Sequence, residues 1–522
     1  MDSKTNIVLD GDRLTIEEVN LGACHPKASV KIAGSAMIGV KKAQAFLDGE
    51  LNKKIIYGVN TGFGPMASHI IGRHQVVALQ ENLIRSHAVG MGDPLPEHYV
   101  LAAMIVRLNT LVKGYSGVSP NLIKQLQTFI NKRIIPVIPE HGAVGTSGDL
   151  VQLAHIALAL IGEGAVFYKG KRQEAAQVLQ RLHVPRYQVR PKEGLALING
   201  TSMMTGIAAL LCIDAQRLLS LSIRLGALSL ELVHGFNDGI SERLHSLRPH
   251  RGQKIVAQTL RTLLASSNVL RSREKFQKSF EVNDEVHKIP EDVQEVYSLR
   301  CIPQVVGPVL DILSKTSHEV DTELNSVTDN PVVDWKNKTF IHGGNFHGDY
   351  IAASVDQLKI GLVKLTMLSE RRTNFFLSHH VNRFFPPFMN LKKPGLTLGL
   401  QGLQFVATST TSQNQTLAFP QYVHSIPTNG DNQDIVSMGT DAALFAAKVI
   451  ENAYIVLAIE LITLAQAVDF LGEKGRLSKS SQELFTELRS VMPVVINDRT
   501  MVEDLQGVLR YVKQSPILDI SW

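Results

Sequence analysis

The segment Thr205–Leu232, TGIAALLCIDAQRLLSLSIRLGALSLEL, is a long stretch of helical pattern. Its apolar residues recur every three or four positions, the spacing that places them on the buried face of an α-helix. The same periodicity is found in Gln75–Val89, His98–Leu111 and Leu150–Leu160. We therefore expect an all-α protein built around long, buried helices.

Strand-like alternation is scarce, so we expect strands to form only a minor part of such a fold. It is limited to Ile7–Leu9 with Leu14–Ile16, and to a ribbon around Val166–Tyr168 in which the following Lys-Gly-Lys predicts a turn. A chain of 522 residues is also too long for one small core. We expect a loop-rich part over residues 1–200 and a long-helix bundle over residues 201–522.

The charge balance argues against nucleic acid as a partner. The 53 basic and 48 acidic residues leave a net charge of only +5, and the basic residues do not gather into a stripe. The three cysteines, Cys24, Cys212 and Cys301, are too far apart for metal-ligand spacing and odd in number for a disulfide framework. A reducing cytoplasm fits this cysteine pattern best.

No segment indicates a membrane protein. The N-terminal stretch carries early acidic residues and has no apolar core of signal-peptide length. The longest apolar run, Ala453–Ile459, ends at Glu460 and is too short to span a bilayer. We interpret this run as part of a buried helix and expect a cytoplasmic protein.

Glycine, proline and asparagine cluster in a few loops, where irregular backbone can aim polar groups. One such loop reads His-Gly-Ala-Val-Gly-Thr-Ser-Gly-Asp over residues 141–149, and Asp149 is placed to cap a helix that begins near Leu150. Taken alone, this pattern is typical of a capping loop. A hydrolase nucleophile elbow is excluded because Asp149 stands where that motif requires glycine.

The loops together resemble the family of histidine, phenylalanine and tyrosine ammonia-lyases and related aminomutases. Its members carry a methylidene-imidazolone electrophile (MIO) made by cyclising an Ala-Ser-Gly triplet, and here the triplet is Thr146-Ser147-Gly148. The resemblance implies that the Gly148 nitrogen attacks the Thr146 carbonyl and that Ser147 loses water to give the methylidene. Glycine permits this close approach, and threonine should be tolerated because the first residue adds only a ring substituent.

The resemblance runs in consistent order from residue 57 to residue 438. It implies a fumarase/aspartase-like helical architecture and a homotetramer in which neighbouring chains complete each site. Tyr57 is the candidate base for the barely acidic β-proton of the substrate. Tyr297 belongs to a second catalytic motif, in which Arg300 would clamp the substrate carboxylate with its two-pronged donor.

The remaining matches are candidate substrate contacts, and each taken singly would pass as a turn, cap or core residue. The full set of expected contacts is Gly64, Ser86, His87, Asn199, Arg300, Gln304, Asn330, Phe346, Asn432 and Gln433. We expect no metal, because His342 and His347 have no third ligand at zinc spacing.

Two positions bear on the substrate ring. His87 can hydrogen-bond a phenol or lie near an imidazole. Gln433 is neutral where histidine ammonia-lyases typically carry a glutamate, a charged partner suited to imidazole. A phenylalanine pocket would leave the His87 imidazole unpaired, at a cost of roughly 1 to 3 kcal/mol. The pattern resembles bacterial tyrosine ammonia-lyases and favours conversion of L-tyrosine to trans-4-coumarate and ammonia.

Three alternatives stay open. The first is a histidine ammonia-lyase, which forms urocanate. The second is a tyrosine or phenylalanine 2,3-aminomutase, which uses the same electrophile but returns the amine to the β-carbon. Sequence does not separate lyase from mutase, because retention of product and ammonia depends on closure of the pocket. The third is a catalytically silent helical scaffold.

Overall fold

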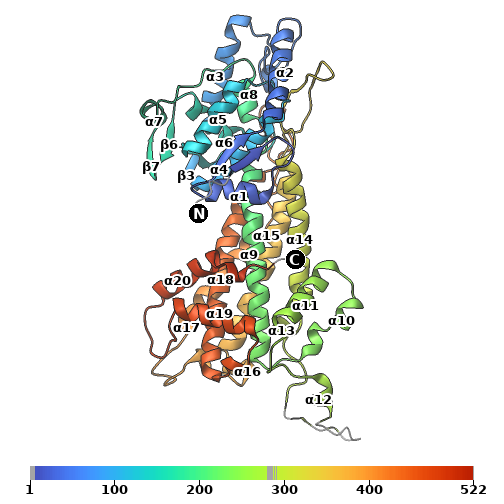
Figure 1. Cartoon of the computed structure of the whole chain (residues 1–522), viewed down its shortest axis with the longest axis vertical. Coiled ribbons are helices and arrows are strands. Elements are labelled where there is room, and N and C mark those ends of the chain that lie inside the picture. Colours follow the sequence, from blue (N-terminus) through green and yellow to red (C-terminus); the bar gives the residue numbers. More distant parts are fainter. Residues whose placement is uncertain (1–5, 279–285, 287, 290, 521) are drawn as a thin grey trace. The chain divides into compact units, whose positions relative to one another are not determined.

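The structure, a computed structural model, describes residues 6–278, 286, 288–289, 291–520 and 522. It is all-α in class, as predicted, and Figure 1 shows the helices that dominate it. The four periodic segments of the sequence correspond to α3 (Val76–His87), α4 (Glu97–Val112), α6 (Leu150–Leu160) and α9 (Ser202–Leu232).

By contacts, the chain divides into two compact units. Unit 1 comprises Met1–Ile213, Lys315–Asp356 and Pro420–Ala446, and unit 2 comprises Asp214–Ser314, Gln357–Phe419 and Ala447–Trp522. Four of the boundaries fall within long helices, which are α9, α14 (Ile302–Leu324), α15 (Asp349–Leu377) and α18 (Gly439–Leu471). The proposed division of the sequence at residue 200 stays a prediction.

The shorter helices complete each unit. In unit 1 they are α1 (Ile16–Cys24), α2 (Gly34–Glu50), α5 (Pro120–Lys132), α7 (Ala175–Arg181) and α8 (Glu193–Ile198). In unit 2 they are α10 (Glu242–Ser246), α11 (Arg251–Leu263), α12 (Arg273–Gln277), α13 (Tyr297–Arg300), α16 (His379–Asn382), α17 (Gln401–Leu417), α19 (Lys479–Val491) and α20 (Val502–Gln514).

The strands are short and peripheral. Three antiparallel pairings join β3 (Met91–Pro94) to β5 (Pro139–His141), β8 (Val332–Asp334) to β9 (Thr339–Ile341), and β4 (Ile135–Pro136) to β6 (Ala165–Tyr168). The ribbon predicted near Val166 is confirmed, because β6 pairs with β7 (Lys171–Glu174) across the Lys-Gly turn.

One strand prediction is wrong. The first strand, β1 (Asn6–Leu9), pairs in parallel with β2 (Ser29–Ile32) and not with Leu14–Ile16. Thr15 instead caps α1, since its hydroxyl accepts from the Glu18 N–H while the Glu18 carboxylate accepts from the Thr15 N–H. This capping box satisfies free backbone donors and starts a helix where sequence alternation indicated a strand.

Among the described residues, two helices are long and apolar enough to cross a bilayer by length and composition alone, α9 and α18. In each, 78% of the most apolar window is buried inside the protein. The run Ala453–Ile459 lies within α18, and its side chains are almost all buried. Both helices are therefore core elements of the structure as described.

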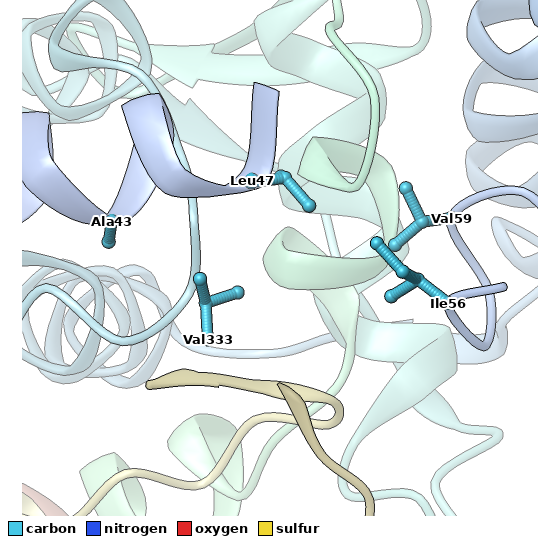
Figure 2. Close-up of a cluster of buried hydrophobic side chains, with 5 residues drawn as sticks. All are labelled: Ala43, Leu47, Ile56, Val59 and Val333. Carbon is cyan, nitrogen blue, oxygen red and sulfur yellow. The ribbon is translucent and has the colours of Figure 1, made fainter. Parts of the chain in front are cut away.

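A small hydrophobic cluster anchors the loop that follows α2. Ala43 and Leu47 of α2 gather with Ile56, Val59 and Val333, and all five are at most 1% exposed (Figure 2). Ile56 and Val59 flank Tyr57, while Val333 lies on β8, a few residues after Asn330. Burial of these side chains fixes the backbone on both sides of Tyr57.

Candidate functional site

A cavity of about 730 Å³ in unit 1 collects most of the residues expected at the site. Loops that are far apart in the sequence meet there with the end of α3 and the start of α6. The predicted residues that line it are Tyr57, Gly64, Ser86, His87, Thr146, Ser147, Gly148, Asn199, Asn330, Phe346, Asn432 and Gln433.

The end of the Thr146–Gly148 triplet is held against the segment before α9. Gly148 has a left-handed φ of +71° and forms a parallel bridge with Gly200. A Cβ on Gly148 would collide with the backbone of Gly200, so glycine is required here on two grounds. The Asp149 N–H donates to the Gly200 carbonyl (2.8 Å), and Asn199 Nδ2 donates to the Ser147 carbonyl (2.8 Å).

The start of the triplet is held from the other side. The Gly145 carbonyl accepts from the Ser437 hydroxyl (3.0 Å) and from the Gly348 N–H (3.1 Å). The Met438 N–H donates to the Val144 carbonyl (3.1 Å). Because hydrogen bonds restrain the backbone before and after it, the triplet is confined to a short bend.

Asp149 does not cap α6, contrary to our prediction. It occupies the N-cap position, but its Oδ2 accepts from the Met203 and Met204 N–H groups (2.9 and 3.0 Å) at the start of α9. Its Oδ1 accepts from the Thr440 hydroxyl (2.6 Å) in the first turn of α18. Free N–H donors of α9 compete successfully for this carboxylate. Complete burial raises the pKa of Asp149 to about 6.

Gln433 contacts the triplet with both atoms of its amide. Its Oε1 accepts from the Thr146 hydroxyl (2.8 Å), and its Nε2 donates to Ser147 Oγ (2.8 Å). The backbone of Gln433 pairs with Thr428 across a turn, with N–H to carbonyl distances of 3.0 and 3.2 Å. Asn432 belongs to the same turn and faces the cavity.

The Tyr57 hydroxyl oxygen accepts a hydrogen bond from the Gly64 N–H (3.0 Å). Gly64 has a φ of +51°, and a Cβ there would meet the Asn429 amide at 2.5 Å. Gln80 connects the loop to Leu195, because its Nε2 donates to the Gly58 carbonyl (2.9 Å) and its Oε1 accepts from the Leu195 N–H (3.0 Å). The phenol is therefore presented to the cavity on a restrained backbone.

His87 lies at the end of α3, half-buried at the cavity wall. Its Nδ1 is 2.9 Å from the Leu83 carbonyl and 3.0 Å from Ser86 Oγ. A carbonyl oxygen only accepts, so Nδ1 carries the proton in that contact. In the neutral ring, Nε2 then has a free lone pair and acts as an acceptor.

Asn330 and Phe346 complete the cavity from the segment between α14 and α15. Asn330 is buried, and its Oδ1 accepts from the Gly343 N–H (3.0 Å). His347, beside Phe346, makes a contact of 3.2 Å between Nε2 and the Ile435 carbonyl. Groups of three metal-binding side chains are absent from the described residues.

Our sequence analysis missed the buried charges behind the site. Lys192 Nζ donates to Asp329 (2.8 Å), and both side chains are fully buried. Arg107, also fully buried, donates through Nε to the Ala196 carbonyl (2.9 Å), and burial lowers its pKa. Asp329 could have been found from the sequence, since it precedes the candidate residue Asn330. Lys192 and Arg107 could not, because residue type does not show that a lysine or arginine is buried.

The apolar wall was also missed. Additional lining residues include Phe63, Met66, Leu79, Leu83, Leu195 and Ile435. The turn residues Thr428 and Asn429 line the cavity as well, in the loop that also contains the predicted residue Asn432. The apolar residues gave no signal in the sequence because they match ordinary core positions.

Tyr297, Arg300 and Gln304 do not line the cavity. They belong to unit 2, at α13 and the start of α14. The Tyr297 side chain is 72% exposed, and the Arg300 guanidinium lies 5.0 Å from the centre of the Tyr297 ring. Their catalytic and binding roles stay predictions.

Comparisons with known proteins agree with this arrangement. Histidine ammonia-lyase from Staphylococcus aureus strain JH9 is 39% identical over 512 residues, which cover 98% of each chain. Among solved structures, tyrosine aminomutase from Streptomyces globisporus has a TM-score of 0.94 at 37% identity and 98% coverage of each chain. Phenylalanine aminomutase from Pantoea agglomerans has a TM-score of 0.94 at 32% identity, covering 99% of this chain and 100% of the other.

The family model described as aromatic amino acid lyase matches residues 14–490, nearly the whole chain. The curated relatives are ammonia-lyases, which break a carbon–nitrogen bond, and this chain is an enzyme of that kind. The chain therefore belongs to the aromatic amino acid lyase family.

Proposed function

We propose that this enzyme eliminates ammonia from L-tyrosine to give trans-4-coumarate, with an MIO electrophile formed from Thr146, Ser147 and Gly148. The observation that carries the proposal is the restrained triplet at the wall of a cavity that also contains Tyr57 and His87. Gly200 and Asn199 would hold the cyclised group through the contacts they make to Gly148 and Ser147. When formed, it supplies an electron-poor alkene that captures the substrate amine covalently.

Tyr57 is the proposed base for the β-proton. Its oxygen accepts the Gly64 N–H, so a fixed backbone donor stabilises negative charge on that atom. The group that holds the Tyr57 oxygen in position is therefore a backbone N–H and not another side chain. Ser147 Oγ leaves during cyclisation, which releases Gln433 Nε2 to donate to the substrate.

Two features support tyrosine as the substrate. The free Nε2 lone pair of His87 can accept the phenol O–H, because Nδ1 is committed to the Leu83 carbonyl. The Gln433 amide is neutral, so it offers no carboxylate to pair with a charged imidazole. Apolar side chains such as Leu83 and Leu195 can cover the faces of an aromatic ring.

Two alternative activities have specific support. The 39% identity to histidine ammonia-lyase favours histidine as substrate, and the likeness to tyrosine and phenylalanine aminomutases favours transfer of the amine to the β-carbon. Side-by-side incubation with tyrosine, phenylalanine and histidine, with products identified by mass spectrometry, separates them. We expect 4-coumarate in excess; faster formation of urocanate or β-tyrosine would reject the proposal.

The proposed electrophile has its own test. Cyclisation and dehydration of Ser147 together remove the mass of two water molecules from the peptide that contains residues 146–148. We expect that loss in the wild type and not in Ser147→Ala. Ser202→Ala is the matched control, since its buried hydroxyl has no hydrogen-bond partner in the described part of the chain. A full-mass wild-type peptide would contradict the proposed cofactor.

We also propose a homotetramer with shared sites, located in the cytoplasm. Apolar side chains such as Leu396 (77%) and Phe405 (64%) are exposed, as on a surface that another chain would cover. In the described part of the chain the cysteines are free thiols with no disulfide between them, which fits a reducing compartment. Light scattering at monomer mass would overturn the tetramer.

Sharing of sites has its own test. Chains with Tyr57→Phe and chains with Arg300→Ala should each be inactive alone. If Arg300 serves a neighbouring chain, co-expression produces some sites that hold both wild-type residues, and activity partly returns. No return of activity in verified mixed oligomers would show that Arg300 does not act across chains.

A further inference from the structure

We propose that Thr146 is a positioning residue for formation of the electrophile, acting through Gln433. This inference rests on the proposed MIO and concerns how this chain makes it. Thr146 stands where the family triplet has alanine, and its hydroxyl donates to Gln433 Oε1 at 2.8 Å. An alanine has no group that could make this bond.

The bond determines which end of the Gln433 amide faces Ser147. With Oε1 held by the Thr146 hydroxyl, Nε2 points to Ser147 Oγ at 2.8 Å and donates to it. A half-turn of the amide would replace this donor with an acceptor. Thr146 is 5% exposed, so bulk water does not readily replace its hydroxyl. The pair therefore aims an N–H group at one particular oxygen.

That oxygen is the leaving group in the covalent chemistry. The Gly148 nitrogen bonds to the Thr146 carbonyl carbon, and that carbonyl oxygen leaves as water with the amide protons of Ser147 and Gly148. Ser147 Oγ then leaves as a second water, carrying its hydroxyl proton and the Cα proton, and the Cα–Cβ double bond remains. A donor on Oγ stabilises the negative charge that develops as the Cβ–Oγ bond breaks.

The other hydrogen bonds described around the triplet are made by its backbone groups. The Gly145 carbonyl and the Asp149 N–H form backbone hydrogen bonds, and Asn199 donates to the Ser147 carbonyl. Among the described residues, Ser147 Oγ takes part in one hydrogen bond, which Gln433 Nε2 donates. Loss of its orientation should therefore slow dehydration without removing the restraints that favour cyclisation.

The test is a time course of electrophile formation in full-length protein made by cell-free synthesis. Samples are quenched, digested and analysed by mass spectrometry for the dehydrated peptide, so the readout does not depend on activity. Thr146→Val keeps the shape and removes the hydroxyl, and we expect roughly three- to tenfold slower conversion, the effect of one hydrogen bond. Thr146→Ser keeps the hydroxyl and should convert at nearly the wild-type rate.

The control is Thr411→Val. Thr411 lies on α17, does not line the cavity, and its buried hydroxyl has no hydrogen-bond partner in the described part of the chain, so the conversion rate of this variant should match the wild type. Gln433→Met removes the amide, and in that background Thr146→Val should cause no further slowing if Thr146 acts through Gln433. Circular dichroism confirms that each variant folds.

Two outcomes would count against the idea. Equal rates for wild type and Thr146→Val, or full additivity of the two substitutions, would overturn the positioning role of Thr146. Both outcomes leave the electrophile itself intact. A wild-type chain that never loses water would instead overturn the proposed function, so the two failures are distinguishable.

Discussion

Asp149→Asn should reduce the dependence of stability on pH. The carboxyl is completely buried, and its pKa is raised from 3.8 to about 6 chiefly by desolvation. One pKa unit corresponds to ~1.4 kcal/mol, so the rise corresponds to up to ~3 kcal/mol. The native state holds this proton more tightly than the unfolded state does. The contribution to the free energy of unfolding is therefore full below pH 3.8 and is lost as the pH rises through about 6.

Asparagine keeps an oxygen that can accept from the Met203 and Met204 N–H groups, and its amide can donate to the Thr440 hydroxyl. It does not titrate, so the variant should lose this pH-dependent term without losing the contacts. The assay is urea denaturation at pH values from 4 to 7, comparing free energies of unfolding. Asp93→Asn, at an exposed carboxylate, is the control. Parallel pH profiles for wild type and Asp149→Asn would refute the reasoning.

Four further predictions concern the proposed chemistry. Tyr57→Phe should lower kcat by roughly 10² to 10⁴, the usual loss for a general base, with ligand binding retained in calorimetry. His87→Phe should lower kcat/KM for tyrosine by roughly 5- to 150-fold, because the phenol O–H loses its acceptor, while kcat/KM for phenylalanine does not fall. Gly148→Ala should give a full-mass peptide, since its φ of +71° and the backbone of Gly200 exclude a side chain; a dehydrated peptide would contradict this. Dialysis against a chelator should leave the rate of ammonia release unchanged, and recovery by added zinc after a loss would refute the absence of a metal.

The helical class and several helices were predictable because their signal is local. In Leu150–Leu160 the spacing of apolar residues alone marks the helix, since the period of an α-helix is a property of the backbone. Thr15 shows where this reasoning failed. A capping box and a strand can share the same few apolar residues, and the side chain of Glu18 decided between them.

The cavity residues that were predicted came from the family resemblance, which rests largely on loops where glycine and asparagine are favoured because the backbone takes unusual conformations. Their partners were not found in this way. Nothing in the sequence near Asp149 shows that its carboxylate would join the starts of α9 and α18, and nothing near Thr146 shows that its hydroxyl would reach Gln433.

Residue patterns were therefore enough to predict the fold class, and the family resemblance that they carry singled out the triplet expected to cyclise. Only the folded chain established which atoms contact that triplet and which side chains carry charge behind it. The reason is physical. Helical periodicity depends on neighbours within about four residues, whereas the bond from Thr146 to Gln433 joins groups 287 residues apart and exists only once the intervening helices have packed.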